Sequence, residues 1–167
     1  MSNPFVAIIM DSDSNLPTMQ TTIDTLKKFN ITYEVKISSA HHTPKRTHDY
    51  VIDAEKRGCA VFICAAGLAA HLAGVVASLT VKPVIGVPID NGPLNGQDAL
   101  LSTVQMPDGI PVACVAIGKT GAKNAAYLAA QIFGASDSAM IDKLIQERAD
   151  NAKAIAAKDD ELQKQLN

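Results

Sequence analysis

The sequence of 167 residues contains no tryptophan, and only 4% of its residues are aromatic. Proteins that bind single-stranded nucleic acid stack the bases on aromatic side chains, so this scarcity argues against a nucleic-acid polymer as a partner. The charges also nearly cancel: the formal net charge of −2 gives no electrostatic attraction to nucleic acid or to an anionic membrane surface. What remains is 47% hydrophobic and 19% charged, the composition of a folded domain with a sizeable core.

Cysteines and long apolar runs are scarce as well. Cys59, Cys64 and Cys114 are odd in number, and none has a second ligand at a spacing that suits a metal, so we expect reduced thiols and no metal site. The apolar run at residues 5–10 is too short to cross a bilayer and has no basic lead of the kind that precedes a signal peptide. We therefore expect a cytoplasmic protein with no membrane partner.

Short runs that are almost entirely apolar recur along the chain and are typical of strands buried on both faces. These runs are residues 5–10, 60–66, 83–89 and 112–118. Residues 31–38 alternate more and are expected nearer an edge of the sheet. Helical patterns lie between the strands, at residues 16–29, 43–57, 69–79 and 121–134. This alternation predicts an α/β fold in which a parallel sheet carries helices on both faces.

The C-terminal stretch, residues 138–166, has a different composition. It is charged, has no glycine or proline, and repeats apolar residues at helical spacing. This pattern predicts a long helix whose apolar stripe needs a partner surface, with a frayed terminal helix as the alternative. We expect residues 1–135 to form the α/β domain and residues 136–167 to form a helical extension used in oligomer contacts.

Two adjacent histidines, His41 and His42, follow the predicted strand at residues 31–38 and precede the helix start at Thr43 and Pro44. Ligands of parallel α/β sheets bind beyond the carboxyl ends of the strands, so the pair lies where a site is expected. Histidine titrates near neutral pH and can deliver and remove a proton. A capping or solvent-facing pair is the alternative.

The loops after the other strands also contain candidate binding residues. Ser12 and Ser14 precede a helix, where hydroxyls and free amides suit a phosphate, although Ser14 or Asn15 could simply cap the helix. Small residues at 64–74 allow a backbone to approach a ligand closely, whereas His71 taken alone is typical of a structural histidine inside the helix. The Gly/Pro-rich residues 88–112 form a long connection of the kind that often serves as a binding lid.

Five motifs follow one another along the chain: 38-SSAHHTP-44, 67-GLAAHLAG-74, 86-GVPI-89, 104-VQMPDGIPVACVAIG-118 and 122-AKNAAYLAAQI-132. Over residues 5–133 the sequence thereby resembles the N5-carboxyaminoimidazole ribonucleotide mutase family of purine biosynthesis, also called the catalytic subunit of phosphoribosylaminoimidazole carboxylase. The resemblance implies a three-layer α/β/α flavodoxin-like protomer that assembles as an octamer, with the C-terminal helical tail reaching over a neighbour. It also implies an isomerase without a cofactor, which moves a carboxylate from the exocyclic nitrogen to ring carbon 4 of an aminoimidazole ribonucleotide.

The resemblance further implies roles for individual residues. His41 is the acid and base that shuttles a proton, while carbon dioxide released from the nitrogen stays enclosed until it reacts at carbon. Residues implied to bind the small-molecule ribonucleotide come from all four loops: Ser12, Ser14 and Asn15; Ser39, Ala40 and His42; Gly67, Ala69, Ala70 and His71; and Leu94 and Gly96. The serines of the first loop would meet the ribose phosphate region, the third loop would line the base and carboxylate pocket, and the fourth would close it.

Several residues depart from the family pattern. Asp11 replaces a glycine, Asn15 replaces the aspartate that holds the ribose hydroxyls, and His42 stands where a phosphate-binding arginine is expected. The other departures are Ala65 and Leu68 for glycines, Ala73 for a proline, Leu79 for a lysine and Asp108 for an arginine. Losing one charge-assisted phosphate contact costs on the order of 2 kcal/mol. Two alternatives therefore stay open: a paralogue that acts on a different small substrate, and a non-catalytic oligomeric binding protein.

Overall fold

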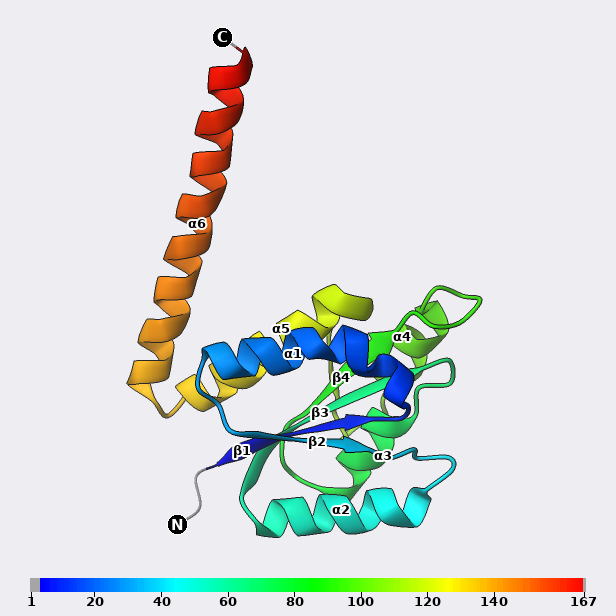
Figure 1. Cartoon of the computed structure of the whole chain (residues 1–167). Coiled ribbons are helices and arrows are strands. Elements are labelled where there is room, and N and C mark those ends of the chain that lie inside the picture. The colour runs from blue at the N-terminus through cyan, green and yellow to red at the C-terminus, as the bar shows by residue number, and fades with distance from the viewer. Residues whose placement is uncertain (1–3, 167) are drawn as a thin grey trace. The chain divides into compact units, whose positions relative to one another are not determined.

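The computed structural model describes residues 4–166 and contains one five-stranded sheet. The strands are β1 (Phe5–Met10), β2 (Tyr33–Ile37), β3 (Cys59–Gly67), β4 (Val84–Ile89) and β5 (Ala113–Cys114). Their order in the sheet is β2-β1-β3-β4-β5, and every neighbouring pair is parallel (Figure 1). The predicted α/β/α flavodoxin-like fold is confirmed.

Helices cover both faces of the sheet (Figure 1). The helices described along the chain are α1 (Leu16–Lys28), α2 (Pro44–Lys56), α3 (Leu72–Leu79), α4 (Gln97–Val104), α5 (Gly118–Gly134) and α6 (Ser138–Leu166), with a short 3-10 turn, η1 (Asp13–Asn15), before α1. On one face α1 contacts α5: the Thr22 hydroxyl of α1 donates a hydrogen bond of 2.6 Å to the Ala122 carbonyl of α5. On the other face α2 packs beside α3. None of the helices described over residues 4–166 is long and apolar enough to cross a membrane.

The central strands explain the near-continuous apolar runs of the sequence. Every residue of β1 and of β4 is buried, and Val6, Ile8 and Ile63 have no exposed surface. A strand covered by helices on both faces buries its side chains on both faces, and each large aliphatic side chain contributes about 2 kcal/mol of transfer free energy. β2 lies at an edge of the sheet, as its more polar sequence predicted, and none of its five residues is fully buried.

Several predicted element boundaries need correction, including that of α5, which begins at Gly118 and not at residue 121. β5 is two residues long instead of spanning residues 112–118, and α5 already begins at Gly118, the last residue of the predicted strand. The helix predicted from residue 69 begins at Leu72. Residues 88–112, predicted as one long connection, contain the helix α4.

The chain divides into two compact units, Met1–Ala129 and Ala130–Asn167. The first contains the sheet. The second contains the helix predicted at residues 138–166, which is confirmed as α6, and every residue from 151 to 166 in that helix is exposed. Both Cys59 and Cys64 of the first unit are buried free thiols, and burial raises the pKa of Cys59 to about 11. The sequence-based boundary between residues 135 and 136 stays a prediction.

Candidate functional site

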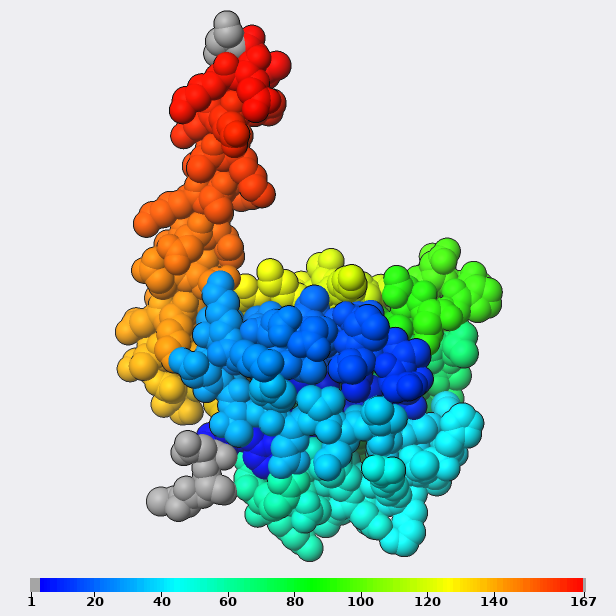
Figure 2. Space-filling model, in the orientation of Figure 1, coloured from blue at the N-terminus to red at the C-terminus, as the bar shows by residue number. Residues whose placement is uncertain are grey.

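The parallel strands bring the four predicted loops together at the carboxyl ends of the strands, which we call the carboxyl edge of the sheet. Met10 at the end of β1 pairs with Ile37 of β2 and with Ala65 of β3, and Gly67 at the end of β3 pairs with Ile89 of β4. The segments that follow these residues therefore emerge at similar heights. Figure 2 shows the start of α1 in dark blue, the loop after β2 in cyan and the segment before α4 in green along the same side of this unit.

His41 and His71 meet at this edge, although 30 positions separate them in the sequence. Nε2 of His41 lies 2.9 Å from Nδ1 of His71, and the two rings are nearly perpendicular at 82° with their centroids 5.0 Å apart. Because β1 separates β2 from β3, the pair spans the end of β1. His71 is exposed and is the N-cap residue of α3, so it lies before the helix and not inside it as predicted.

Ser39 organises the loop that carries both adjacent histidines. Its hydroxyl oxygen accepts hydrogen bonds from the backbone N–H of His41 at 3.3 Å and of His42 at 3.1 Å. The same oxygen lies 3.5 Å from Nδ1 of His42. Thr43 is the N-cap residue of α2, at the predicted helix start, but its hydroxyl makes no cap hydrogen bond. It donates to the Ser39 carbonyl at 3.0 Å and accepts from the Ser39 N–H at 2.9 Å. Half-buried Ala40 packs against the core, so the loop is fixed at both its backbone and its one apolar side chain.

In the first loop the serines contact one another. The hydroxyls of Ser12 and Ser14 share a hydrogen bond of 2.8 Å, and Ser12 accepts from the Ser14 N–H at 3.2 Å, which caps η1. Asn15 is the N-cap residue of α1, as the alternative allowed, although its side chain makes no cap hydrogen bond there. Asn15 is buried and donates Nδ2 to Oδ1 of Asp11 at 2.5 Å. Oδ1 of Asn15 is a buried acceptor with no partner among the described residues.

Asp11 places a carboxylate in the middle of the site, between the His41 loop and the loop after β3. Burial raises the pKa of Asp11, and the Asn15 amide, the Gly67 N–H and the nearby His41 oppose that shift. Its own N–H donates to the Ala65 carbonyl at 3.1 Å, which extends the β1–β3 pairing by one residue. From the sequence Asp11 was only a departure from a family pattern. The sequence signal that could have identified Asp11 as a site residue is Asn15, which follows four residues later and hydrogen-bonds to it.

The loop after β3 approaches the segment after β4 very closely. Gly67 is buried, and a methyl group on its Cα would lie 1.9 Å from Oδ1 of Asn91. Exposed Ala69 precedes buried Ala70, whose N–H donates to the Ser102 hydroxyl of α4 at 3.1 Å. The missing side chain at Gly67 thus makes room for Asn91, independently of any ligand.

Leu94 and Gly96, the predicted closing residues, lie on the segment that leads into α4. The Leu94 side chain is 58% exposed. Gly96 is buried, has a φ of +82° and lies against Ile117 and Asp90.

Among the predicted site residues, hydrogen bonds and ring contacts bring together His41 with His71, Ser39 with His42, and Ser12 with Ser14.

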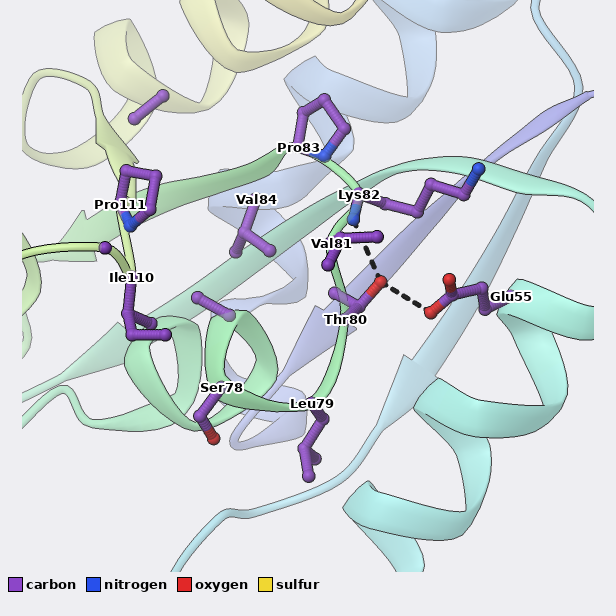
Figure 3. A pocket seen from close by; sticks show the side chains of 13 residues that line it. Glu55, Ser78, Leu79, Thr80, Val81, Lys82, Pro83, Val84, Ile110 and Pro111 are labelled. Atoms are coloured by element: carbon purple, nitrogen blue, oxygen red, sulfur yellow. Dashed lines mark hydrogen bonds between the residues drawn. The ribbon is translucent and has the colours of Figure 1, made fainter.

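A separate cavity of about 770 Å³ lies at the amino end of β4, on the far side from the carboxyl edge (Figure 3). Its lining includes Leu79, Val81 and Ile110, and Glu55 of α2 accepts a 2.6 Å hydrogen bond from the Thr80 hydroxyl. No site residue predicted from the sequence lines this cavity. Within residues 4–166, no three or more His, Cys, Asp or Glu side chains are grouped so that they could hold a metal ion.

Comparisons with known proteins extend over nearly the whole chain. The AIR carboxylase family matches residues 5–154. A relative from Pyrococcus horikoshii, named N5-carboxyaminoimidazole ribonucleotide mutase, is 52% identical over 155 residues, which cover 93% of this chain and 86% of the relative. A relative of the same name from Bacillus subtilis is 47% identical over 159 residues, covering 95% and 98%. The crystal structure of Treponema denticola PurE matches with a TM-score of 0.86 at 31% identity, covering 96% of this chain and 99% of that chain.

Proposed function

Because the chain belongs to the AIR carboxylase family, we propose that it is an N5-carboxyaminoimidazole ribonucleotide mutase of purine biosynthesis. The reaction moves a carboxylate from the exocyclic nitrogen to ring carbon 4 of an aminoimidazole ribonucleotide. The observation that carries the proposal is the exposed His41–His71 pair at the carboxyl edge of the sheet, beside the hydroxyls of the first loop. Ligands of parallel α/β proteins bind at this edge.

His41 has the chemistry that the carboxyl migration needs. A proton delivered to the exocyclic nitrogen allows its bond to the carboxylate to break, which yields carbon dioxide and the aminoimidazole. Ring carbon 4 then attacks the carbon dioxide and must lose its own proton, which returns to the imidazole. The proton account closes on one residue, so the reaction is an isomerisation with no net proton exchanged.

His71 serves as the hydrogen-bonding partner of His41. In a neutral pair of imidazoles, one ring donates across the 2.9 Å contact and the other accepts, so the contact fixes the tautomers of both rings. The proton that His41 delivers to the exocyclic nitrogen returns to it from ring carbon 4, so His71 acts through the hydrogen bond and supplies no proton of its own. The same contact orients His41, whose loop is already held by Ser39.

The remaining predicted residues are assigned to binding. Ser12, Ser14 and Asn15 meet the ribose phosphate region, and Ser39, Ala40 and His42 form the adjoining wall. Gly67, Ala69, Ala70 and His71 line the pocket for the base and the migrating carboxylate, and Leu94 and Gly96 close it. The hydroxyls and backbone N–H groups at the start of α1 support this assignment, because such groups suit a phosphate.

The assembly is inferred to be a homo-oligomer, and specifically an octamer, with the cytoplasm as its compartment. The support for self-association comes from α6, where Ile145 and Ile155 are 61% and 66% exposed. Apolar side chains at helical spacing favour a partner surface, and a second copy of the chain supplies one.

The test is turnover of N5-carboxyaminoimidazole ribonucleotide by the purified protein without ATP. Replacing His41 by Asn should abolish product formation, because an amide cannot exchange a proton in this pH range. The matched control is His48→Asn, which removes an exposed histidine of α2 beside Asp49 and should leave turnover intact. Turnover that survives in His41→Asn would refute the role of His41, and a wild-type protein without turnover would refute the proposed reaction.

A further inference from the structure

Leu68 has a backbone conformation that its side chain disfavours. Its φ is +54°, in the left-handed region that glycine adopts freely and a branched aliphatic residue rarely does. It directly follows β3 at the edge of the proposed site, and its side chain is 50% exposed. Such strain persists only where surrounding contacts hold it, and it is typical of functional positions.

Gly92, on the segment after β4, forms the contact that holds the Leu68 side chain. A methyl group on Cα of Gly92 would lie 2.4 Å from Cδ2 of Leu68, so the isobutyl group rests directly on the glycine backbone. The φ of Gly92 is outside the left-handed region, so its missing side chain is explained by space for Leu68 and not by backbone conformation. The Leu68 side chain thus occupies the space that a side chain at position 92 would need.

The same two segments fit together in the opposite direction as well. Asn91 lies against Gly67, where a methyl group would approach its Oδ1 to 1.9 Å. From α4, the Ser102 hydroxyl accepts from the Ala70 N–H at 3.1 Å and lies 3.4 Å from the Leu68 carbonyl. Each segment thus provides one glycine that receives a side chain of the other.

We propose that Leu68 is a further specificity-determining residue of the site, which latches residues 90–96 onto the loop after β3 and keeps the pocket closed during the reaction. The chemical consequence rests on the proposed function. Carbon dioxide formed when the carbon–nitrogen bond breaks must react at ring carbon 4 before it leaves, and a closed pocket favours that outcome over escape. Escape would leave the decarboxylated aminoimidazole ribonucleotide as a side product.

The first experiment measures amide hydrogen exchange of residues 91–96 in the full-length protein. Leu68→Gly removes the isobutyl group and suits the left-handed backbone, so it should fold while exchange in this segment rises about tenfold. Asn30→Gly is the matched control, because Asn30 also has a positive φ, of 56°, but ends α1. Exchange in residues 91–96 that is unchanged in Leu68→Gly, or equally raised in Asn30→Gly, would overturn the latch.

The second experiment tests the contact itself with Gly92→Ala alone and in combination with Leu68→Gly. The alanine methyl should displace the leucine, lower the Tm and raise exchange at residues 91–96. In the Leu68→Gly background the added methyl meets only Asp98, at an ordinary contact distance of 3.5 Å, so its effect on both quantities should disappear. Equal effects of Gly92→Ala in the two backgrounds would show that the residues do not interact and would overturn the proposal.

The third experiment measures the ratio of aminoimidazole ribonucleotide to carbon-carboxylated product. This ratio should rise at least about threefold in Leu68→Gly if exchange rises about tenfold, and stay at the wild-type value in Asn30→Gly. A ratio that is unchanged while exchange rises would overturn the role of Leu68 in closure. If the variants show the expected exchange effects but the wild-type protein has no turnover, the proposed mutase reaction is refuted and the latch is confirmed.

Discussion

Asp11 is a half-buried carboxylate whose charge opposes folding. Burial raises its pKa above the ordinary value, which means that the folded protein favours the protonated acid. A group with a raised acid pKa contributes to stability below its unfolded pKa, and that contribution is lost as pH rises through the folded pKa. At neutral pH the charged form of Asp11 therefore lowers the free energy of unfolding.

Replacing Asp11 by Asn should raise the Tm at neutral pH, and the gain should shrink as the pH is lowered into the range where the acid is protonated. Asp13→Asn is the control: it removes the same charge two residues away from an exposed side chain, and its Tm should match that of the wild type. Thermal denaturation at a series of pH values measures both. A lower Tm for Asp11→Asn at neutral pH would contradict the desolvation argument.

His42 stands at the position where the family resemblance places a phosphate-binding arginine. Arginine keeps its charge at all working pH values, whereas a histidine loses its charge as the pH rises. His42→Arg should therefore tighten substrate binding by up to about thirtyfold at pH 8 and flatten the pH dependence of KM. His48→Arg adds the same group on α2 and should leave KM unchanged. Equal KM values for His42→Arg and wild type at pH 8 would show that position 42 does not bind phosphate.

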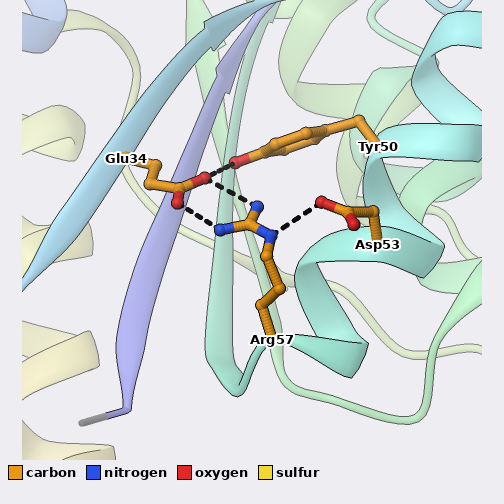
Figure 4. A network of polar contacts seen from close by, with 4 residues as sticks. All are labelled: Glu34, Tyr50, Asp53 and Arg57. Carbon is orange, nitrogen blue, oxygen red and sulfur yellow. Dashed lines mark hydrogen bonds and ion pairs between the residues drawn. The ribbon is translucent and has the colours of Figure 1, made fainter. Parts of the chain in front are cut away.

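At the scale of elements, a polar network joins the edge strand β2 to α2 (Figure 4). Glu34 of β2 accepts two hydrogen bonds from the Arg57 guanidinium, one of them 2.9 Å long, and a third from the Tyr50 hydroxyl at 3.1 Å. Arg57 also donates Nε to Asp53 at 2.7 Å and lies over the Phe5 ring. The Arg57 hydrogen bonds are the main reason that the pKa of Glu34 is lowered. The network thus holds an edge strand that has a sheet neighbour on one side only.

Glu34→Gln should lower stability at neutral pH by about 1 kcal/mol, a Tm loss of roughly 3 °C. A group with a lowered acid pKa contributes to stability above its unfolded pKa and loses that contribution as pH falls through the folded pKa. The difference from wild type should therefore vanish in acid. Asp49→Asn, which breaks the exposed Lys45–Asp49 pair within α2, is the control and should leave the Tm unchanged. Equal losses for both variants would show that the network has no special weight.

At the scale of the whole molecule, α6 presents an exposed apolar stripe. Ile141, Ile145, Ile155, Leu162 and Leu166 are all at least 38% exposed. Apolar side chains that share one face of a charged helix favour burial against another surface.

Ile155→Lys should shift the protein to smaller oligomers in light scattering, because it places a charge on the stripe. Ala154→Lys adds the same charge at the neighbouring exposed position, off the stripe, and should retain the wild-type mass. Circular dichroism should show equal helix content in the two variants. A common mass for both variants would contradict the proposed use of the stripe.

The sequence determined the fold class and most of the elements. Apolar runs of six or seven residues predict buried parallel strands because both faces of such strands are covered, and the charged stretch without glycine or proline predicts α6. The carboxyl-edge position of His41 also follows from local order, since it comes directly after a strand. The exceptions, the short β5 and the helix α4, lie in the Gly/Pro-rich segments, where the local sequence pattern favours neither helix nor strand clearly.

Only the tertiary structure decided which side chains meet. The His41–His71 contact spans 30 positions, Ser39 accepts from the histidine loop, and Leu68 rests on Gly92. Periodicity and capping are properties of neighbours in sequence, so they fix helices and strands but carry no information on side-chain direction across loops. Those contacts arise when β1, β2, β3 and β4 align their carboxyl ends, because the shared register brings distant loops within hydrogen-bonding reach.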